Sequence, residues 1–188
     1  MKLTETSYSK GLVEFIELAP EAGRFLREAR SPEDWDQVIQ KYQIKRFQKG
    51  NLVFNFPREQ YSKLDRGETP ETVNARYFTL STAPYTNPAV QTVTGESLRL
   101  ANSTIAIDPS NAKNTIVRFI LDVGQFVGGW STAILIGGAS ATITPGSGKI
   151  VAAVNNVKDD TSAPLNRDGS TIHLVNWKIK HLDSSEVS

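Results

Sequence analysis

The chain of 188 residues contains no cysteine, which excludes disulfide bonds, thiolate nucleophiles and every metal site that needs a cysteine ligand. Only two histidines are present, His173 and His181, so the residue most used in acid–base and metal chemistry is scarce. Basic and acidic residues nearly cancel, with 21 Lys+Arg against 20 Asp+Glu. Such a balance creates no strong field, so we expect no nucleic-acid or membrane partner.

A hydrophobic run long enough to cross a membrane is also lacking. The least charged stretch, 123–143, is interrupted by five glycines, whereas a spanning helix needs about 20 mostly apolar residues. Residues 1–15 contain no continuous apolar segment of the kind found in signal peptides. We therefore expect synthesis and folding in the cytoplasm.

Charged residues are distributed unevenly along the chain. Residues 1–71 carry 24 charged side chains, whereas residues 72–188 carry only 17 and are richer in Thr, Ser, Asn, Gly and Val. Charge-dense sequence favours helices with a solvated face, and Thr/Val-rich sequence with tight turns favours strands. The predicted organisation is a helical N-terminal region over 1–49, a strand plus polar connection over 50–74, a β-rich domain over 75–183 and a tail over 184–188.

Within the first region, apolar residues at helical spacing predict helices over 12–19 and 22–29, separated by Pro20. The clearest start signal is Ser31-Pro32-Glu33-Asp34, which offers a capping hydroxyl, a proline at the first helical position and acidic residues in the first turn. It predicts a helix over 32–43. Alternation over 52–56 predicts a short strand, and the polar segment 57–74 is predicted to be an exposed connection.

From residue 75 onward the sequence predicts a succession of short strands separated by turns rich in Gly, Asn, Asp and Pro. The nearly continuous apolar run 115–123 is typical of a central strand, whereas 171–182 alternates and should have one wet face. We expect an α+β fold, a predominantly antiparallel β-sandwich, jelly roll or barrel with a short N-terminal helical region. The predicted strands are 76–81, 89–93, 97–100, 104–107, 115–123, 131–136, 139–144, 149–154 and 171–182.

Two features, a glycine-rich segment and the pair of histidines, suggest chemistry that the rest of the sequence does not support. The segment 145–149 (PGSGK) lacks the first glycine, the final Ser/Thr and the helix of a phosphate-binding loop, so we expect a hairpin turn. On one strand, His173 and His181 would be separated by roughly 26 Å and could not share a metal ion. We expect both histidines at the surface or at strand ends. No cofactor fingerprint is found, so we expect no cofactor and no enzymatic activity.

The best acidic cluster is Asp159 and Asp160 with Asp168, in the polar segment 155–170. Oxygen-rich loops can bind calcium, but the alternating ligand spacing of a helix–loop–helix calcium site is absent. We expect a solvated loop in preference to a calcium site or a catalytic pair of carboxylates. Trp130 follows two glycines at a turn or strand start, where an indole fills the core, contacts a subunit or stacks on a sugar. These four residues are the candidate interface or ligand contacts.

The low-charge stretch 86–182, with segments such as NPAVQTVTGESLRLANSTIAI and STAILIGGASATITPGSG, resembles virion structural proteins of tailed bacteriophages, such as head-decoration, neck, tail or baseplate components. The resemblance is compositional and carries no functional residue. It implies self-association and incorporation into a virion or other assembly, with copies of the chain and neighbouring structural proteins as partners. The alternative is a β-sandwich module that binds a carbohydrate or a protein.

Overall fold

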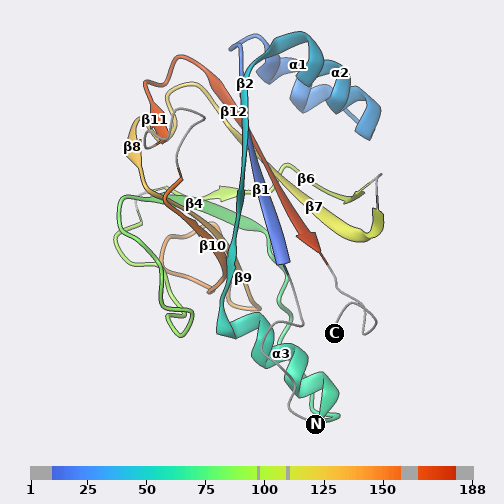
Figure 1. Cartoon of the computed structure of the whole chain (residues 1–188), viewed down its shortest axis with the longest axis vertical. Helices are drawn as coiled ribbons and strands as arrows, with labels where there is room; N and C mark the ends of the chain where they lie inside the picture. The colour runs from blue at the N-terminus through green and yellow to red at the C-terminus, as the bar shows by residue number, and fades with distance from the viewer. Residues whose placement is uncertain (1–9, 97, 109–110, 158–164, 181–188) are drawn as a thin grey trace.

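The computed structural model describes residues 10–96, 98–108, 111–157 and 165–180. Two five-stranded antiparallel sheets pack face to face (Figure 1). In spatial order, sheet A consists of β2 (Gln43–Gly50), β1 (Lys10–Leu18), β12 (Ile172–Lys180), β7 (Asn111–Leu121) and β6 (Thr104–Asp108). Sheet B consists of β3 (Leu52–Val53), β10 (Lys149–Asn155), β9 (Thr132–Gly137), β4 (Tyr77–Ser81) and β5 (Leu100–Ala101). A separate two-stranded sheet pairs β11 (Leu165–Arg167) with β8 (Gly128–Trp130).

The main core lies between the inner faces of the two sheets. Alternation along each strand sends every second side chain inward, so β7 and β12 contribute Phe119 and Trp177 from sheet A. Phe78 of β4 and Leu135 of β9 meet them from sheet B. The stacking of two antiparallel sheets around this layer confirms the predicted α+β, predominantly β-sandwich architecture, although neither sheet closes into a barrel.

Helices α1 (Ala22–Glu28) and α2 (Pro32–Tyr42) cover part of the outer face of sheet A, at the end of the molecule opposite α3 (Asn55–Asp65) (Figure 1). The predicted start of α2 is confirmed by a capping box, in which the Ser31 hydroxyl accepts from the Asp34 backbone N–H and the Asp34 carboxylate accepts from the Ser31 N–H. Trp35 and Ile39 then pack on Leu174 of β12. The predicted wet face of β12 is therefore buried beneath the helices along its first half.

The outer face of sheet B is covered by the irregular segment 82–96 rather than by helices. Tyr85 and Val93 of this segment pack on Ile134 and Ile136 of β9. Val93 is thus buried in a loop, and the strand predicted over 89–93 is not formed. Because β9 is covered on both faces, all of its residues are buried.

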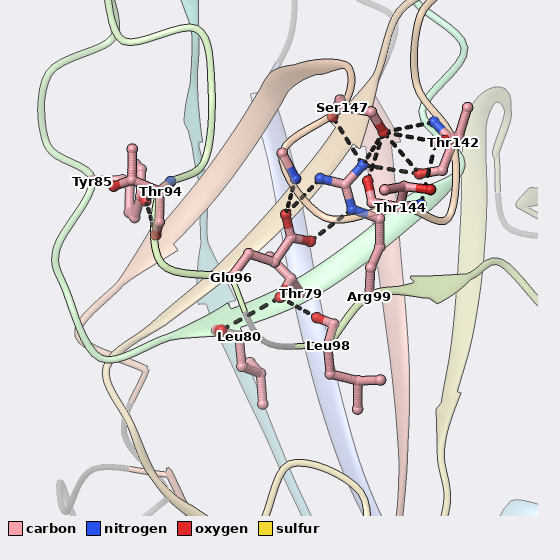
Figure 2. A network of polar contacts seen from close by, with 11 residues as sticks. Thr79, Leu80, Tyr85, Thr94, Glu96, Leu98, Arg99, Thr142, Thr144 and Ser147 are labelled. Carbon is pink, nitrogen blue, oxygen red and sulfur yellow. Dashed lines mark hydrogen bonds and ion pairs between the residues drawn. The ribbon is translucent and has the colours of Figure 1, made fainter.

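An ion pair between Arg99 and Glu96 fastens this cover, and both side chains are almost fully enclosed, at 0% and 1% exposure. Figure 2 shows the Arg99 guanidinium pointing into the turn formed by 142–147. It donates to both Glu96 carboxylate oxygens, at 2.6 and 2.5 Å, and to the backbone carbonyls of Thr142 and Ser147, at 2.9 and 2.8 Å. The strand predicted over 139–144 is wrong, because these residues form the turn that receives Arg99.

In the N-terminal half, the helix predicted over 12–19 is also wrong. Residues 12–19 lie in β1 and not in a helix, so region 1–49 is helical only in α1 and α2 within its described part. The apolar residues of 12–19 match helical spacing, but in β1 they serve two buried faces, with Phe15 in the inter-sheet core and Ile16 beneath the helices. Burial on both faces removes the alternation that identifies a strand.

The third helix replaces much of the predicted connection 57–74. The predicted strand 52–56 stops at Val53, and α3 follows with Pro57 near its start, where a missing N–H is tolerated. Phe56 anchors the helix in the inter-sheet core, and the Gln60 side-chain oxygen accepts from the Glu71 backbone N–H at 2.8 Å. Two side chains, Phe56 and Gln60, hold this helix in place. The mostly polar composition of the segment gave no sign of these contacts.

Candidate functional site

Trp130 lies at the end of β8, half-buried against the main core. Its indole N–H donates to the Phe126 carbonyl at 2.6 Å, and its ring meets the Phe126 ring edge to face, with centroids 5.7 Å apart. Both the polar edge and part of the apolar surface of the indole are thus engaged within the chain. This arrangement resembles core packing more than a free platform for a sugar.

The acidic cluster is only partly placed. Asp159 and Asp160 lie outside the described residues. Asp168 is exposed just after β11, and its carboxylate accepts from the Ser170 hydroxyl at 2.7 Å and the Ser170 N–H at 2.8 Å. These bonds lower the pKa of Asp168 and close a local turn. Among the described residues, no group of three or more potential metal ligands is found.

His173 is buried, at 4% exposure, which corrects the expectation of a surface position, although it does lie at a strand end, as the second residue of β12. Its place on β12 puts it on the same face as Val175 and Trp177, toward the sandwich interior. Burial, reinforced by the positive charge of Arg167, lowers its pKa to about 3, so the imidazole is neutral at physiological pH. His181 lies outside the described residues.

The segment 145–149 joins the antiparallel strands β9 and β10, with Lys149 as the first residue of β10. Strand β10 follows it where a phosphate-binding loop would need a helix, so the segment belongs to a connection between antiparallel strands, as predicted. Gly148 has φ +71°, and a Cβ there would lie 2.6 Å from the Ala141 Cβ. Ser147 serves the Arg99 ion pair through its carbonyl and hydroxyl oxygens.

The four sheet edges differ in how they are protected against pairing with another chain. Both edges of sheet B are strands of only two residues, β3 and β5. On sheet A, β2 is long but carries the charged residues Lys45, Arg46 and Lys49. Short edge strands and edge lysines are the usual protections against edge-to-edge association. Strand β6, at the other edge of sheet A, has neither.

Exposed isoleucines mark the β6 edge. Ile107 is 65% exposed, and Ile105 is about half exposed opposite Val117 of β7. Because Val117 faces the inter-sheet core, Ile105 lies on the inner face of sheet A where sheet B no longer covers it. An apolar groove of about 230 Å³ borders this place, lined by Ile105 and by Tyr61 of α3 among others. This β6 surface, formed by Ile105, Ile107 and the groove, is the first candidate site.

A second candidate site lies on the outer face of sheet A, next to α2. The strand registers align one row of polar residues across all five strands. From β2 to β6 the row consists of Gln48, Glu14, Asn176, Arg118 and Thr104. Glu14 and Arg118 are buried, and buried atoms of Thr104, Arg118 and Asn176 have no hydrogen-bond partner among the described residues.

Glu14 is the best-satisfied member of this polar row. Its carboxylate accepts from Arg46 at 2.7 Å, from Gln48 at 2.8 Å and from Asn176 at 2.9 Å. Burial alone would raise the pKa of Glu14, but the bonds from Asn176, Gln48 and Arg46 together hold it below its ordinary value. The negative charge of Glu14 is therefore already compensated by hydrogen bonds and an ion pair within the protein.

A cavity of about 220 Å³ opens between the polar row and the first turns of α2. Arg118 lines it at 6% exposure, and its guanidinium carbon lies 5.2 Å from the Trp35 ring centroid. Desolvation lowers the pKa of Arg118, against the opposing influence of Asp36, Glu14 and Asp108. No sequence motif marks this site; the one local signal is that Glu14 and Arg118 are polar interruptions within the otherwise apolar strand segments VEFI and IVRFI.

Comparison with known proteins adds no assignment to either site: no family model matches the chain, and neither a curated protein nor a solved structure matches it.

Proposed function

We propose that this chain is a non-enzymatic structural protein that associates with copies of itself as a component of a larger particle. The observation that carries the proposal is the β6 surface, the one described sheet edge that combines an ordinary strand length with exposed apolar residues and little charge. An unprotected edge of this kind favours pairing with another strand.

The occupant that fits the β6 surface is a second copy of the chain. Two β6 strands meeting antiparallel about a two-fold axis would present the same surface to each other and extend sheet A across both copies. Ile105 and Ile107 of each copy would be removed from water, at roughly 25 cal/mol per Å² of apolar area buried. The β2 edge, with its lysines and arginine, would remain at the far side of each copy.

A particle of the tailed-phage virion type is the finer part of the proposal. It is supported by the compositional resemblance of stretch 86–182, and neighbouring structural proteins would be further partners. The described part of the chain contains no helix long and apolar enough to cross a membrane. The alternative, a glycan- or protein-binding module, gains no support from Trp130, because its indole N–H is already bonded within the chain.

The experiment is size-exclusion chromatography with light scattering on the parent chain and two variants, over a range of concentrations. Ile107→Lys places a charge on the β6 edge, and we expect it to convert a multimer to a monomer. Ile44→Lys is the matched control, because Ile44 is also exposed, at 53%, but lies on the already charged β2 edge. It should keep the mass of the parent.

A parent chain that stays monomeric at every concentration would contradict self-association. Equal masses for the parent multimer and Ile107→Lys would instead show that association does not use β6. Circular dichroism of both variants checks that they remain folded.

A further inference from the structure

Arg118 is unusual among the buried charged residues because it forms no hydrogen bond with the part of the chain that the structure describes. None is formed between its guanidinium and the described residues, and its Nε is enclosed without a partner. Its contact with the Trp35 ring is a cation–π interaction, which compensates only part of the hydration that burial removes. Buried charged groups are normally paired and hydrogen-bonded. The cavity beside Arg118 is where a missing partner would be found.

The charges around the cavity identify the kind of partner. Glu14 is paired with Arg46, at 2.7 Å, and Asp108 with Lys178, at 2.8 Å. Of the cations that line the cavity, Arg118 is the one without an ion pair to any described residue. Guanidinium groups bind carboxylates through parallel hydrogen bonds, which makes a carboxylate the complementary group.

Asp36 provides a second point of contact. It lines the same cavity from α2, is exposed, and forms no ion pair or hydrogen bond with the described residues. It raises the pKa of Arg118 through space, yet the two side chains do not form an ion pair. A ligand with a carboxylate at one end and a positive, hydrogen-bond-donating group at the other would bridge them.

We propose that the cavity between α2 and the polar row binds a small zwitterion of the α-amino-acid type, its carboxylate on Arg118 and its ammonium group on Asp36. The volume of about 220 Å³ suits a ligand smaller than the drug-sized molecules held by pockets of ~300–1,000 Å³. The lining side chains include three cations (Arg46, Arg118 and Lys178) and three anions (Glu14, Asp36 and Asp108), so the cavity is neutral overall and matches a neutral zwitterion. The site is separate from the β6 surface, so it does not depend on self-association.

The test is titration of the full chain, followed by nitrogen–proton NMR, with four probes. L-Alanine carries both charged groups, N-acetyl-L-alanine and acetate carry the carboxylate alone, and glucose carries neither. The Arg118 Nε–H resonance, assigned from its loss in Arg118→Met, reports the guanidinium, and the Trp35 indole resonance reports α2. We expect both to shift with alanine at the lowest concentrations, with the two plain carboxylates at higher ones, and not with glucose.

Three variants assign the two ends of the ligand. Arg118→Met should weaken alanine binding at least about tenfold, as expected for a hydrogen bond to a charged group. Asp36→Asn should weaken alanine up to about fivefold and leave acetate unchanged, because Asp36 is exposed and meets only the ammonium group. Glu33→Gln, also on α2 but outside the cavity, is the control and should bind like the parent.

The outcomes separate the proposal from its rivals. Saturable shifts from glucose alone would overturn it in favour of a polyol site, and equal binding of acetate and alanine would overturn the assigned role of Asp36. If none of the four probes shifts either resonance, the proposal is overturned and the cavity holds only water. If Arg118→Met does not fold, Asp36→Asn still decides the outcome through the alanine-to-acetate ratio.

Discussion

The two sheets of the sandwich treat their buried polar groups in opposite ways. On the outer side of sheet B, Arg99 and Glu96 are almost completely enclosed and each nitrogen of the guanidinium has an acceptor within 2.9 Å. On the outer side of sheet A, Arg118 is nearly as buried but has no hydrogen bond within the described residues. A buried arginine therefore holds two segments together on sheet B, whereas on sheet A a buried arginine has no hydrogen-bond acceptor among the described residues.

This contrast extends beyond the two arginines. Most of the buried side-chain atoms that lack a partner belong to strands of sheet A, whereas the strands of sheet B contribute none among the described residues. Unpaired buried polar atoms reduce stability, and they are retained where they serve binding or another constraint. The difference fits the two proposals made above, which place self-association at the β6 surface and ligand binding in the cavity beside α2, both on sheet A, and leave sheet B a structural role.

Arg99→Met should give the largest effect on stability. The substitution leaves the Glu96 carboxylate buried without its counter-ion and strips the carbonyls of Thr142 and Ser147 of a donor. Removing one partner of a buried pair costs about 3–5 kcal/mol of unfolding free energy. Urea denaturation followed by tryptophan fluorescence measures it.

Arg118→Met is the comparison variant for the same measurement. Because Arg118 has no ion pair to lose and methionine fills a similar length with apolar atoms, its unfolding free energy should stay within about 1 kcal/mol of the parent or rise. Equal losses in the two variants would show that Arg118 is a structural clasp like Arg99, and the contrast between the sheets would then be wrong.

His173 gives sheet A a specific sensitivity to acid. Its pKa is about 3 in the folded chain and 6.5 as a free group, so below 6.5 the unfolded chain binds a proton that the folded chain does not. Stability should therefore fall as pH drops from 6.5 toward 3, by roughly 2 kcal/mol at about pH 5. His173→Gln, which does not titrate, should remove this part of the pH dependence in urea denaturation. An unchanged slope would mean that the imidazole gains access to water.

The sequence predicts the β-sandwich and the start of α2 because both depend on local signals. Turn residues separate the strands, and Ser31 with Asp34 forms a capping box within a few positions. The strand nature of β1 and the polar row depend on partners far along the chain. Glu14 meets Asn176 only through the pairing of β1 with β12, and Arg118 joins them only through β7. The residue pattern within any one segment does not reveal how these three strands are aligned with one another.

Ser31→Ala should destabilise the chain less than Arg99→Met or the acidification of His173, and it tests how the outer face of sheet A is covered. The substitution removes the hydroxyl that accepts from the Asp34 N–H at 3.1 Å, and loss of such a cap costs about 1 kcal/mol. This cost should be smaller than that of Arg99→Met, because α2 also rests on Trp35 and Ile39, both buried. Hydrogen exchange should accelerate in α2 and not in β9. Faster exchange in β9 as well would show that the two covers unfold together, and that the sheets are less independent than their polar contacts indicate.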